Sequence, residues 1–329
     1  MSFDPDAPAA PGSLFGLPCT PREALVHVQA VPWQATTSYR RGTIEGPAAL
    51  VRASAQVDLY DVEYGDAWRA GVVLLPEDPQ FRRWDGEAEA DALRVIESLG
   101  QDPEAAGRVN VLSERVNEAV YQRARAVLAA GRVPALVGGD HSTPFGAIRA
   151  VAEVFPGVGI LHVDAHADLR EAYEGFTHSH ASIMFNVLRY IQGVSNIIQL
   201  GIRDVGDAER RLIHDTPSRI STLFDADVAS RLAEGESFAA VVDELVEKLP
   251  PRVYVSFDVD GLDPSLCPGT GTPVPGGLSF RDAQVLFKRL SARRRIVGFD
   301  VNEIGPGEWD GNVAARLFHK LFGACVRSQ

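Results

Sequence analysis

Short apolar runs alternate with amphipathic segments along almost the whole chain, and this alternation constrains the fold more than any other feature of the sequence. The apolar runs are rich in Val, Ile and Leu without regular polar alternation, which is typical of parallel strands buried on both faces. The expected strands are residues 25–33, 135–138, 158–164, 196–202, 253–258 and 296–301. Strand and helix following each other in turn predict a three-layer α/β/α fold with a central, mostly parallel sheet.

Helix ends can be read at three places between these strands. Ser113 is expected to cap a helix that Gly131 ends, and Ser237 is expected to cap a second helix. Ser279, followed three residues later by Asp282, has the form of a capping box and predicts a third helix start. Each helix joins two expected strands, as the layered fold requires.

No internal repeat or low-complexity linker divides the chain, so residues 21–329 are expected to form one domain. Residues 1–20 are acidic and rich in proline, without the basic start and apolar core of a signal peptide, and are expected to form a loose arm. Residues 63–109 contain a strand candidate at 72–75 and a charged helical stretch at 87–99. This region is expected to be an insertion or a peripheral layer.

Charge and cysteine content exclude several classes of protein. The net charge of −12 disfavours nucleic acid as a partner and favours a cation. Cys19, Cys267 and Cys325 are few and widely spaced, which excludes a disulfide framework and suits a reducing compartment. No apolar run approaches the about 20 residues that a membrane span needs. We therefore expect a cytoplasmic protein without nucleic-acid or membrane partners.

Carboxylates and imidazoles follow three of the expected strands. The motifs are GGDHS at 138–142, DAHAD at 164–168 and DVDGLDP at 258–264. Ligands of an open α/β sheet bind at the carboxyl ends of its strands, so these motifs lie where a site is expected. Residues two apart point the same way in an extended chain, so Asp258 and Asp260 can face one pocket. A single Asp-x-Asp is more often a turn, but three such motifs at three strand ends favour a shared site.

Several aspartates in one pocket resist ionisation unless positive charge lies among them. Two divalent metal ions would supply that charge. Mixed His and Asp ligands without thiolate suit manganese, cobalt, nickel or zinc, and the carboxylate-rich set favours manganese. His162 lies within its strand, and we expect it to be a hydrogen-bonded core residue rather than a ligand.

The sequence resembles the ureohydrolase family of arginases and agmatinases. The motifs that carry the resemblance are GGDHS at 138–142, DAHADLR at 164–170, SFDVDGLDPS at 256–265 and PGTGTPVPGGLS at 268–279, with weaker matches at 40–50, 200–204 and 298–306. Together they span most of the chain from about residue 26. The resemblance implies an arginase-like α/β/α domain with two Mn²⁺ ions per chain, assembled as a trimer or hexamer.

The resemblance also implies roles for individual residues. The metal ligands would be His141, Asp164, His166, Asp168, Asp258 and Asp260, with Asp164 and Asp258 bridging the two ions. Glu303 would grip the guanidinium group of the substrate, and His180 would move protons, with His178 as the competing assignment. Asp168 is expected to pass a proton to the leaving nitrogen as well as to bind metal.

The segment at 168–182 resembles the agmatinase branch, because it lacks the Thr/Ser/Asn-rich loop that arginases use to recognise the amino-acid end of arginine. The implied reaction converts agmatine to putrescine and urea. Residues 181–182, Ala-Ser, replace the Gly-Thr pair of many agmatinases, and residues 32–43 also depart from the usual pattern. These departures leave the identity of the amine open.

Glu171 and Glu174 follow Asp168 and are expected to attract a distal ammonium group, while Arg170 is expected to be tied to neighbouring acids. One alternative is a related enzyme acting on guanidinobutyrate, arginine or formiminoglutamate. A dinuclear phosphoesterase would need more histidine ligands downstream of His180. A non-catalytic metal-binding relative would be expected to have lost a ligand or Glu303, and none is lost.

Overall fold

A single parallel sheet organises the computed structural model, which describes residues 3–9 and 12–329. Its strand order is β2-β1-β3-β8-β7-β4-β5-β6, and every described pairing is parallel. The strands are β1 (Val26–Val31), β2 (Val72–Leu74), β3 (Val133–Gly138), β4 (Val158–Val163), β5 (Val194–Ile202), β6 (Ile220–Phe224), β7 (Arg252–Asp258) and β8 (Arg295–Asn302). The predicted fold class is confirmed, although the half-buried edge strand β6 was not predicted.

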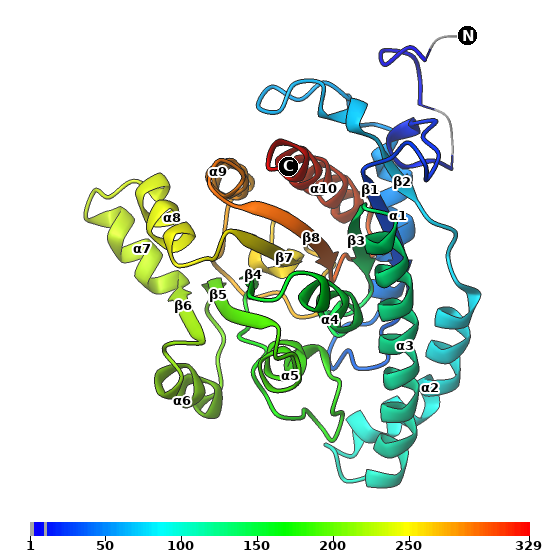
Figure 1. Ribbon diagram of the computed structural model, residues 1–329. Helices are drawn as coiled ribbons and strands as arrows, with labels where there is room; N and C mark the ends of the chain where they lie inside the picture. Colours follow the sequence, from blue (N-terminus) through cyan, green and yellow to red (C-terminus); the bar gives the residue numbers. More distant parts are fainter. Residues whose placement is uncertain (1–2, 10–11) are drawn as a thin grey trace.

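Helices cover both faces of the sheet (Figure 1). One layer contains α1 (Gly46–Ser54), α7 (Asp225–Ala233), α8 (Phe238–Glu247), α9 (Phe280–Ser291) and α10 (Glu308–Arg327). The other contains α2 (Pro79–Glu97), α3 (Pro103–Ala129), α4 (Phe145–Val154), α5 (Ile183–Tyr190) and α6 (Asp207–Asp215). Successive residues of a strand face opposite layers, so Val137 packs into the first core and Leu136 into the second. Two apolar cores therefore hold the sheet rigid between them.

Two of the three predicted helix starts are confirmed. Ser237 caps α8 by accepting a hydrogen bond from the Ala240 amide, and Ser279 with Asp282 forms the capping box of α9. The third is wrong, because α3 begins at Pro103, well before Ser113. Asp102 supplies the cap, and a proline suits the first helical turn because its missing N–H would be unpaired there.

Residues 14–17, part of the segment predicted as a loose arm, are packed into the domain. Leu14, Phe15 and Leu17 are buried in the core beside α1, and the Phe15 amide donates to Ser54 Oγ at 3.0 Å. The prediction for this segment is therefore wrong at these residues. Residues 63–109 supply the edge strand β2 and the helix α2, which packs against α3 with Phe81 fully buried. That region thus supplies one edge of the sheet and the outer helix of one layer.

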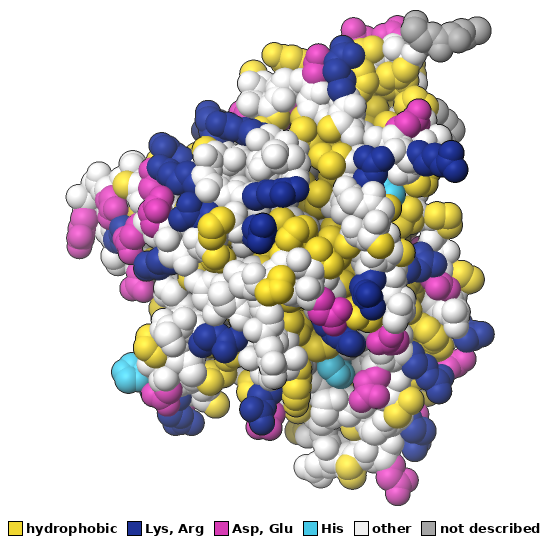
Figure 2. All heavy atoms as spheres, in the orientation of Figure 1, with side chains coloured by type: hydrophobic (Ala, Val, Ile, Leu, Met, Phe, Trp, Pro, Cys, Tyr) yellow, Lys and Arg dark blue, Asp and Glu magenta, His cyan; other side chains and the backbone are white. Residues whose placement is uncertain are grey.

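The described surface carries charges of both signs. Lys and Arg side chains are intermingled with Asp and Glu side chains on the face drawn in Figure 2. Cys19, Cys267 and Cys325 are all free, as the sequence predicted. Among the helices of residues 3–9 and 12–329, none combines the length and the apolar character needed to cross a bilayer.

Candidate active site

The three acidic and histidine-rich motifs meet at the carboxyl edge of the sheet because their strands are near neighbours. β3, β7 and β4 lie within the contiguous set β3-β8-β7-β4 at the centre of the sheet. The turn after β3 passes very close to the end of β1: the Gly139 and Asp140 amides donate to Val31 and Trp33 carbonyls at 2.9 and 2.8 Å. A Cβ at Gly139 would lie 1.9 Å from the Trp33 carbonyl oxygen, so this turn requires glycine.

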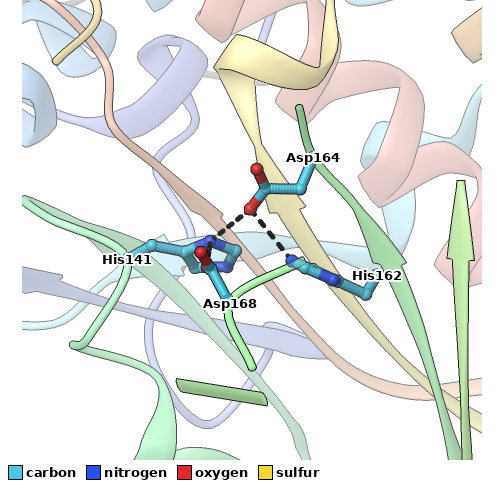
Figure 3. A group of neighbouring side chains, drawn as sticks. All are labelled: His141, His162, Asp164 and Asp168. Carbon is cyan, nitrogen blue, oxygen red and sulfur yellow. Dashed lines mark hydrogen bonds and ion pairs between the residues drawn. The ribbon is translucent and has the colours of Figure 1, made fainter. Parts of the chain in front are cut away.

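The first cluster of site residues surrounds the imidazole of His141. Its Nδ1 lies 2.9 Å from Asp164 Oδ2, 3.2 Å from Asp168 Oδ2 and 3.3 Å from Asp258 Oδ2. Figure 3 shows the side chain of His141, which follows β3, and those of Asp164 and Asp168, which follow β4, pointing toward one another. All four side chains are buried.

The second cluster surrounds His166 and shares one member with the first. His166 Nδ1 lies 3.0 Å from Asp260 Oδ2 and 3.4 Å from Asp164 Oδ1. Asp164 therefore presents one oxygen to each histidine. The side chain of His166 is 25% exposed, so this half of the site is the one that reaches solvent. The structure thus brings together all six residues expected as metal ligands.

His141 is oriented by two residues to which the sequence analysis gave no role. Its Nε2 lies 2.9 Å from Ser256 Oγ, and that hydroxyl donates to Asp300 Oδ1 at 3.0 Å. Because the Ser256 proton is directed to Asp300, His141 donates Nε2–H to Ser256 and turns the Nδ1 lone pair toward the three carboxylates. Lone pairs facing carboxylate oxygens repel unless a proton or a cation lies between them. The donor set therefore fits a metal ion.

His162 supports Asp164 from within β4. Gln199 Nε2 donates to His162 Nδ1 at 3.0 Å and to the Ala167 carbonyl at 2.7 Å, which leaves His162 Nε2 to donate to Asp164 Oδ2 at 2.9 Å. His162 is fully buried. This is the hydrogen-bonded core position expected from the sequence.

The electrostatics of the clusters also favour cations. Burial and the charge of Asp164 raise the pKa of Asp168 to about 8, and burial together with Asp260 and Asp164 raises the pKa of Asp258 well above its usual value. Burial opposes a charge on His166, yet Asp260 and Asp164 raise its pKa to about 12. The carboxylates thus draw positive charge onto the histidines. Cations held among these residues would offset the repulsion between the carboxylates.

Glu303 lies beside these clusters with one oxygen engaged and one free. The His141 amide donates to Glu303 Oε1 at 3.0 Å, while Oε2 is buried without a hydrogen-bond partner among the described residues. Burial, with the negative charges of Asp140 and Asp260, raises the pKa of Glu303 well above its usual value. The missing side chain of Gly271 leaves space at Oε2, since a Cβ there would lie 2.8 Å from this oxygen. A cationic group that donates hydrogen bonds would satisfy Oε2.

Two of the expected functional residues have left-handed backbone conformations. Asp168 has φ of 54° and Glu303 has φ of 60°. Non-glycine residues rarely adopt this region, and where they do so at a site the surrounding structure holds them there. The Asp168 carbonyl accepts from the Met184 and Phe185 amides at the start of α5, and the Glu303 amide donates to the Gly139 carbonyl. These backbone contacts fix the direction of both carboxylates.

The structure separates the two candidate proton-handling histidines. His180 lines a cavity of about 250 Å³ that His166 and Asp168 also line. His178 instead lies in a different depression, where its ring contacts Phe145 with centroids 5.3 Å apart. Burial lowers the pKa of His180 against the opposing charge of Asp140, so its imidazole is neutral at pH 7 and able to accept a proton.

We expect His180→Ala to lower kcat about 10²–10⁴-fold, the usual effect of losing an acid–base group, because this imidazole faces the cavity. His178→Ala is the matched control and should change kcat by less than about threefold, because its ring packs outside the cavity. Steady-state kinetics of both variants, with metal content measured in parallel, check the prediction. The reverse order of effects would contradict the placement of His180.

Two acidic residues other than those expected line the cavity. Asp204 and Glu209 belong to the lining, whereas Glu171 is exposed elsewhere and Glu174 lies against the backbone of Gly100. The expectation that Glu171 and Glu174 wall the pocket is therefore wrong. Other residues of the same loop, Arg170 and Tyr173, do line the cavity.

Arg170 is tied to an acid, as the sequence predicted. Its Nε lies 3.6 Å from Glu209 Oε2, and its guanidinium stacks on Tyr173 at 4.8 Å from the ring centroid. Glu209 also accepts from the Leu169 and Gly206 amides. Among the described residues Asp204 has neither an ion pair nor a hydrogen bond to its carboxylate. Asp204 is therefore an exposed carboxylate in the cavity lining that no other described residue engages.

Known proteins resemble this chain along most of its length. The model of the arginase family matches residues 24–326. An N(1)-aminopropylagmatine ureohydrolase of Thermus thermophilus is 33% identical over 92% of this chain and 90% of its own. Arginase-1 of Mus musculus is 27% identical over 81% of this chain and 80% of its own. The solved agmatine ureohydrolase of Thermoplasma volcanium superposes with a TM-score of 0.73 at 28% identity, over 94% of this chain and 92% of the other.

Proposed function

The chain belongs to the arginase family of hydrolases that act on guanidino C–N bonds, and from this premise we propose that it hydrolyses a small guanidino-amine such as agmatine to urea and the free amine. The observation that carries the proposal is Glu303, which lies beside the two histidine-carboxylate clusters and whose buried Oε2 has no hydrogen-bond partner among the described residues. A guanidinium group supplies the positive charge and the N–H donors that this oxygen lacks. We further propose two Mn²⁺ ions per chain and assembly as a trimer or hexamer.

The metal site is proposed at the two clusters that share Asp164. His141, Asp164, Asp168 and Asp258 would hold one ion, and His166 and Asp260 would hold the other with Asp164 and Asp258 between them. Divalent ions bound there supply the activation of water, whose own pKa is otherwise far above neutral. The remaining requirements of the reaction fall to the side chains of the protein.

Each of three side chains has one task in the proposed reaction. Glu303 holds the guanidinium group and so fixes its carbon in attack geometry. Asp168, whose carboxylate faces the cavity, takes the proton of the attacking water and delivers it to the nitrogen that leaves as the amine. His180 exchanges protons between the cavity and solvent. Water adds across the C–N bond, so the products are urea and an amine.

The free carboxylate of Asp204 supports a substrate with a distal ammonium group. Relatives of this chain carry the names N(1)-aminopropylagmatine ureohydrolase and agmatine ureohydrolase, whose substrates have such a group. A guanidino acid would need a free cation at the same place. Arg170 does not supply one, because Glu209 and Tyr173 already engage it.

Urea release from agmatine, N(1)-aminopropylagmatine, arginine and 4-guanidinobutyrate tests the substrate assignment. We expect kcat/KM for the guanidino-amines to exceed that for the two carboxylate-bearing compounds by at least about tenfold, because like charges at the cavity mouth repel. Asp204→Asn should raise KM for the amines about three- to fivefold, a modest effect because the pair is exposed. Glu171→Gln is the control and should leave KM unchanged.

A preference for 4-guanidinobutyrate or arginine would contradict the guanidino-amine assignment while leaving the metal chemistry intact. An unchanged KM in Asp204→Asn would remove only the role of Asp204. Failure of the manganese-loaded wild-type protein to release urea from any guanidino compound would contradict the proposed function as a whole.

A further inference from the structure

The hydroxyl of Thr36 lies between the turn after β3 and the segment that carries His180. Thr36 Oγ1 donates to Asp140 Oδ2 at 2.8 Å, and it accepts from the His180 amide at 3.1 Å. The Thr36 amide also donates to Asp140 Oδ2, at 3.2 Å. Thr36 and Asp140 are fully buried. Three segments that are distant in the sequence therefore meet at one oxygen atom.

The direction of these hydrogen bonds follows from the chemistry of the groups. An ionised carboxylate only accepts, so the single hydroxyl proton of Thr36 is committed to Asp140. The lone pairs of Oγ1 are then available to the His180 amide, which is the first N–H of the 3-10 helix His180–Ser182 and has no partner within that helix. A hydroxyl meets both needs, and a side chain of similar shape without one meets neither.

Asp140 connects this contact to the rest of the site through its neighbour in the sequence. The Nδ1 atom of His141 lies among the carboxylates of the first cluster, and the His141 amide donates a hydrogen bond to Glu303. His141 thus belongs to the first cluster and contacts Glu303, the residue proposed to bind the guanidinium group. Asp140, the residue before it, is connected through Thr36 to the backbone of His180.

We propose that Thr36 is a positioning residue, which sets the place of His180 relative to Asp168 and Glu303 by joining the His180 amide to Asp140. This inference rests on the proposed function, in which His180 moves protons. The segment is anchored independently on either side, by Asn186 Nδ2 donating to the Thr177 carbonyl and by the Arg170 amide donating to the Ala181 carbonyl. Loss of the Thr36 hydroxyl therefore moves His180 locally and leaves the loop in place.

Thr36→Val and Thr36→Ser form the first test, measured on the manganese-loaded full chain. We expect Thr36→Val to lower kcat about 10–100-fold with KM within about threefold, since a misplacement of about 1 Å can cost a factor near 100. Thr36→Ser keeps the hydroxyl and should stay within about threefold of wild type. Thr43→Val is the control, because Thr43 is another buried threonine whose hydroxyl has no hydrogen-bond partner among the described residues. A fall in kcat below fivefold in Thr36→Val, or an equal fall in Thr36→Ser, overturns the proposal.

A double-mutant cycle tests whether Thr36 acts through His180. Alanine at 180 keeps the backbone amide and removes only the imidazole, so adding Thr36→Val to His180→Ala should lower kcat by less than twofold further. A further fall as large as in the wild-type background overturns the proposal, because Thr36 would then act on another group.

A spectroscopic measurement separates this proposal from the proposed function. In protein labelled with ¹⁵N-histidine, the His180 amide signal should shift and exchange faster with solvent in Thr36→Val, and should stay near its wild-type position in Thr36→Ser and Thr43→Val. If the wild type hydrolyses no guanidino compound, the proposed function fails and this signal alone decides whether Thr36 holds His180. An unchanged signal in Thr36→Val overturns the proposal.

Discussion

Asp164→Asn is expected to lower kcat/KM by at least about 10³-fold and to reduce the metal content of the purified chain below two ions. Asp164 offers Oδ2 to His141 and Oδ1 to His166, so it is the one side chain common to both clusters. An amide presents a single carbonyl oxygen and no charge, and cannot serve two cations at once. Under the proposed function, a chain that has lost an ion would no longer activate water near neutral pH. Metal analysis by mass spectrometry together with urea-release kinetics measures both effects.

Asp85→Asn is the matched control for this prediction. Asp85 is a buried carboxylate outside the clusters, with a pKa raised by burial to about 6, and it accepts a hydrogen bond from the Gln34 amide that asparagine can also accept. This variant should keep its metal and its activity. One tightly bound ion in a fully active wild-type chain, or full activity in Asp164→Asn, would show that the site does not work with two shared ions.

Glu303→Gln is expected to lower kcat/KM about 10²–10⁴-fold while metal content stays at the wild-type value. The glutamine oxygen can still accept from the His141 amide, but an NH₂ group then replaces Oε2 and opposes the N–H donors of a guanidinium group. Breaking a buried pair between a charge and its hydrogen-bonded partner costs about 2–5 kcal/mol, or about 30- to 5000-fold, which covers most of this range. Kinetics with agmatine and calorimetric titration with a non-hydrolysed guanidinium compound measure the loss.

Thermal unfolding provides an internal check on Glu303→Gln. Burial already raises the pKa of Glu303, so removing its charge should not lower the melting temperature of the chain at pH 7. Glu153→Gln, at an exposed glutamate, serves as the control for the substitution itself. Retained activity in Glu303→Gln would assign the guanidinium group to another acceptor. A loss of metal would show that Glu303 supports the ligands instead.

The fold and the gathering of the metal-type residues could be predicted because both depend on local patterns and one rule of topology. Apolar runs mark strands, and the carboxyl ends of parallel strands share an edge, so motifs after β3, β4 and β7 had to lie near one another. The missed strand β6 is short and half-buried at the sheet edge, and its Ser-Thr centre weakens the apolar signal. The start of α3 is marked by Asp102, which caps the helix, and by Pro103 in its first turn. This pair was missed because it lies within residues 63–109, where the hydrophobic pattern is least regular.

The contacts that orient the site could not be read from sequence because they join distant segments through ordinary residue types. Nothing near Thr36 indicates that its hydroxyl reaches both Asp140 and His180, and nothing near Ser256 indicates that it connects His141 to Asp300. Likewise, Asp204 follows a different strand from the loop expected to wall the cavity. Serine and threonine are common in every environment, so their roles emerge only when their neighbours in space are known.

The left-handed backbone conformations of Asp168 and Glu303 imply that selection for stability and selection for activity favour different residues at these two positions. Each such conformation costs a non-glycine residue about 1–3 kcal/mol, and glycine adopts it freely. A library screened for heat resistance alone should therefore accumulate Gly at these two positions and yield chains that are more stable but inactive. Homologous proteins that keep Asp and Glu at these positions would be expected to be under selection for catalytic activity. Replacement of both residues would indicate a homologue that is no longer under this selection.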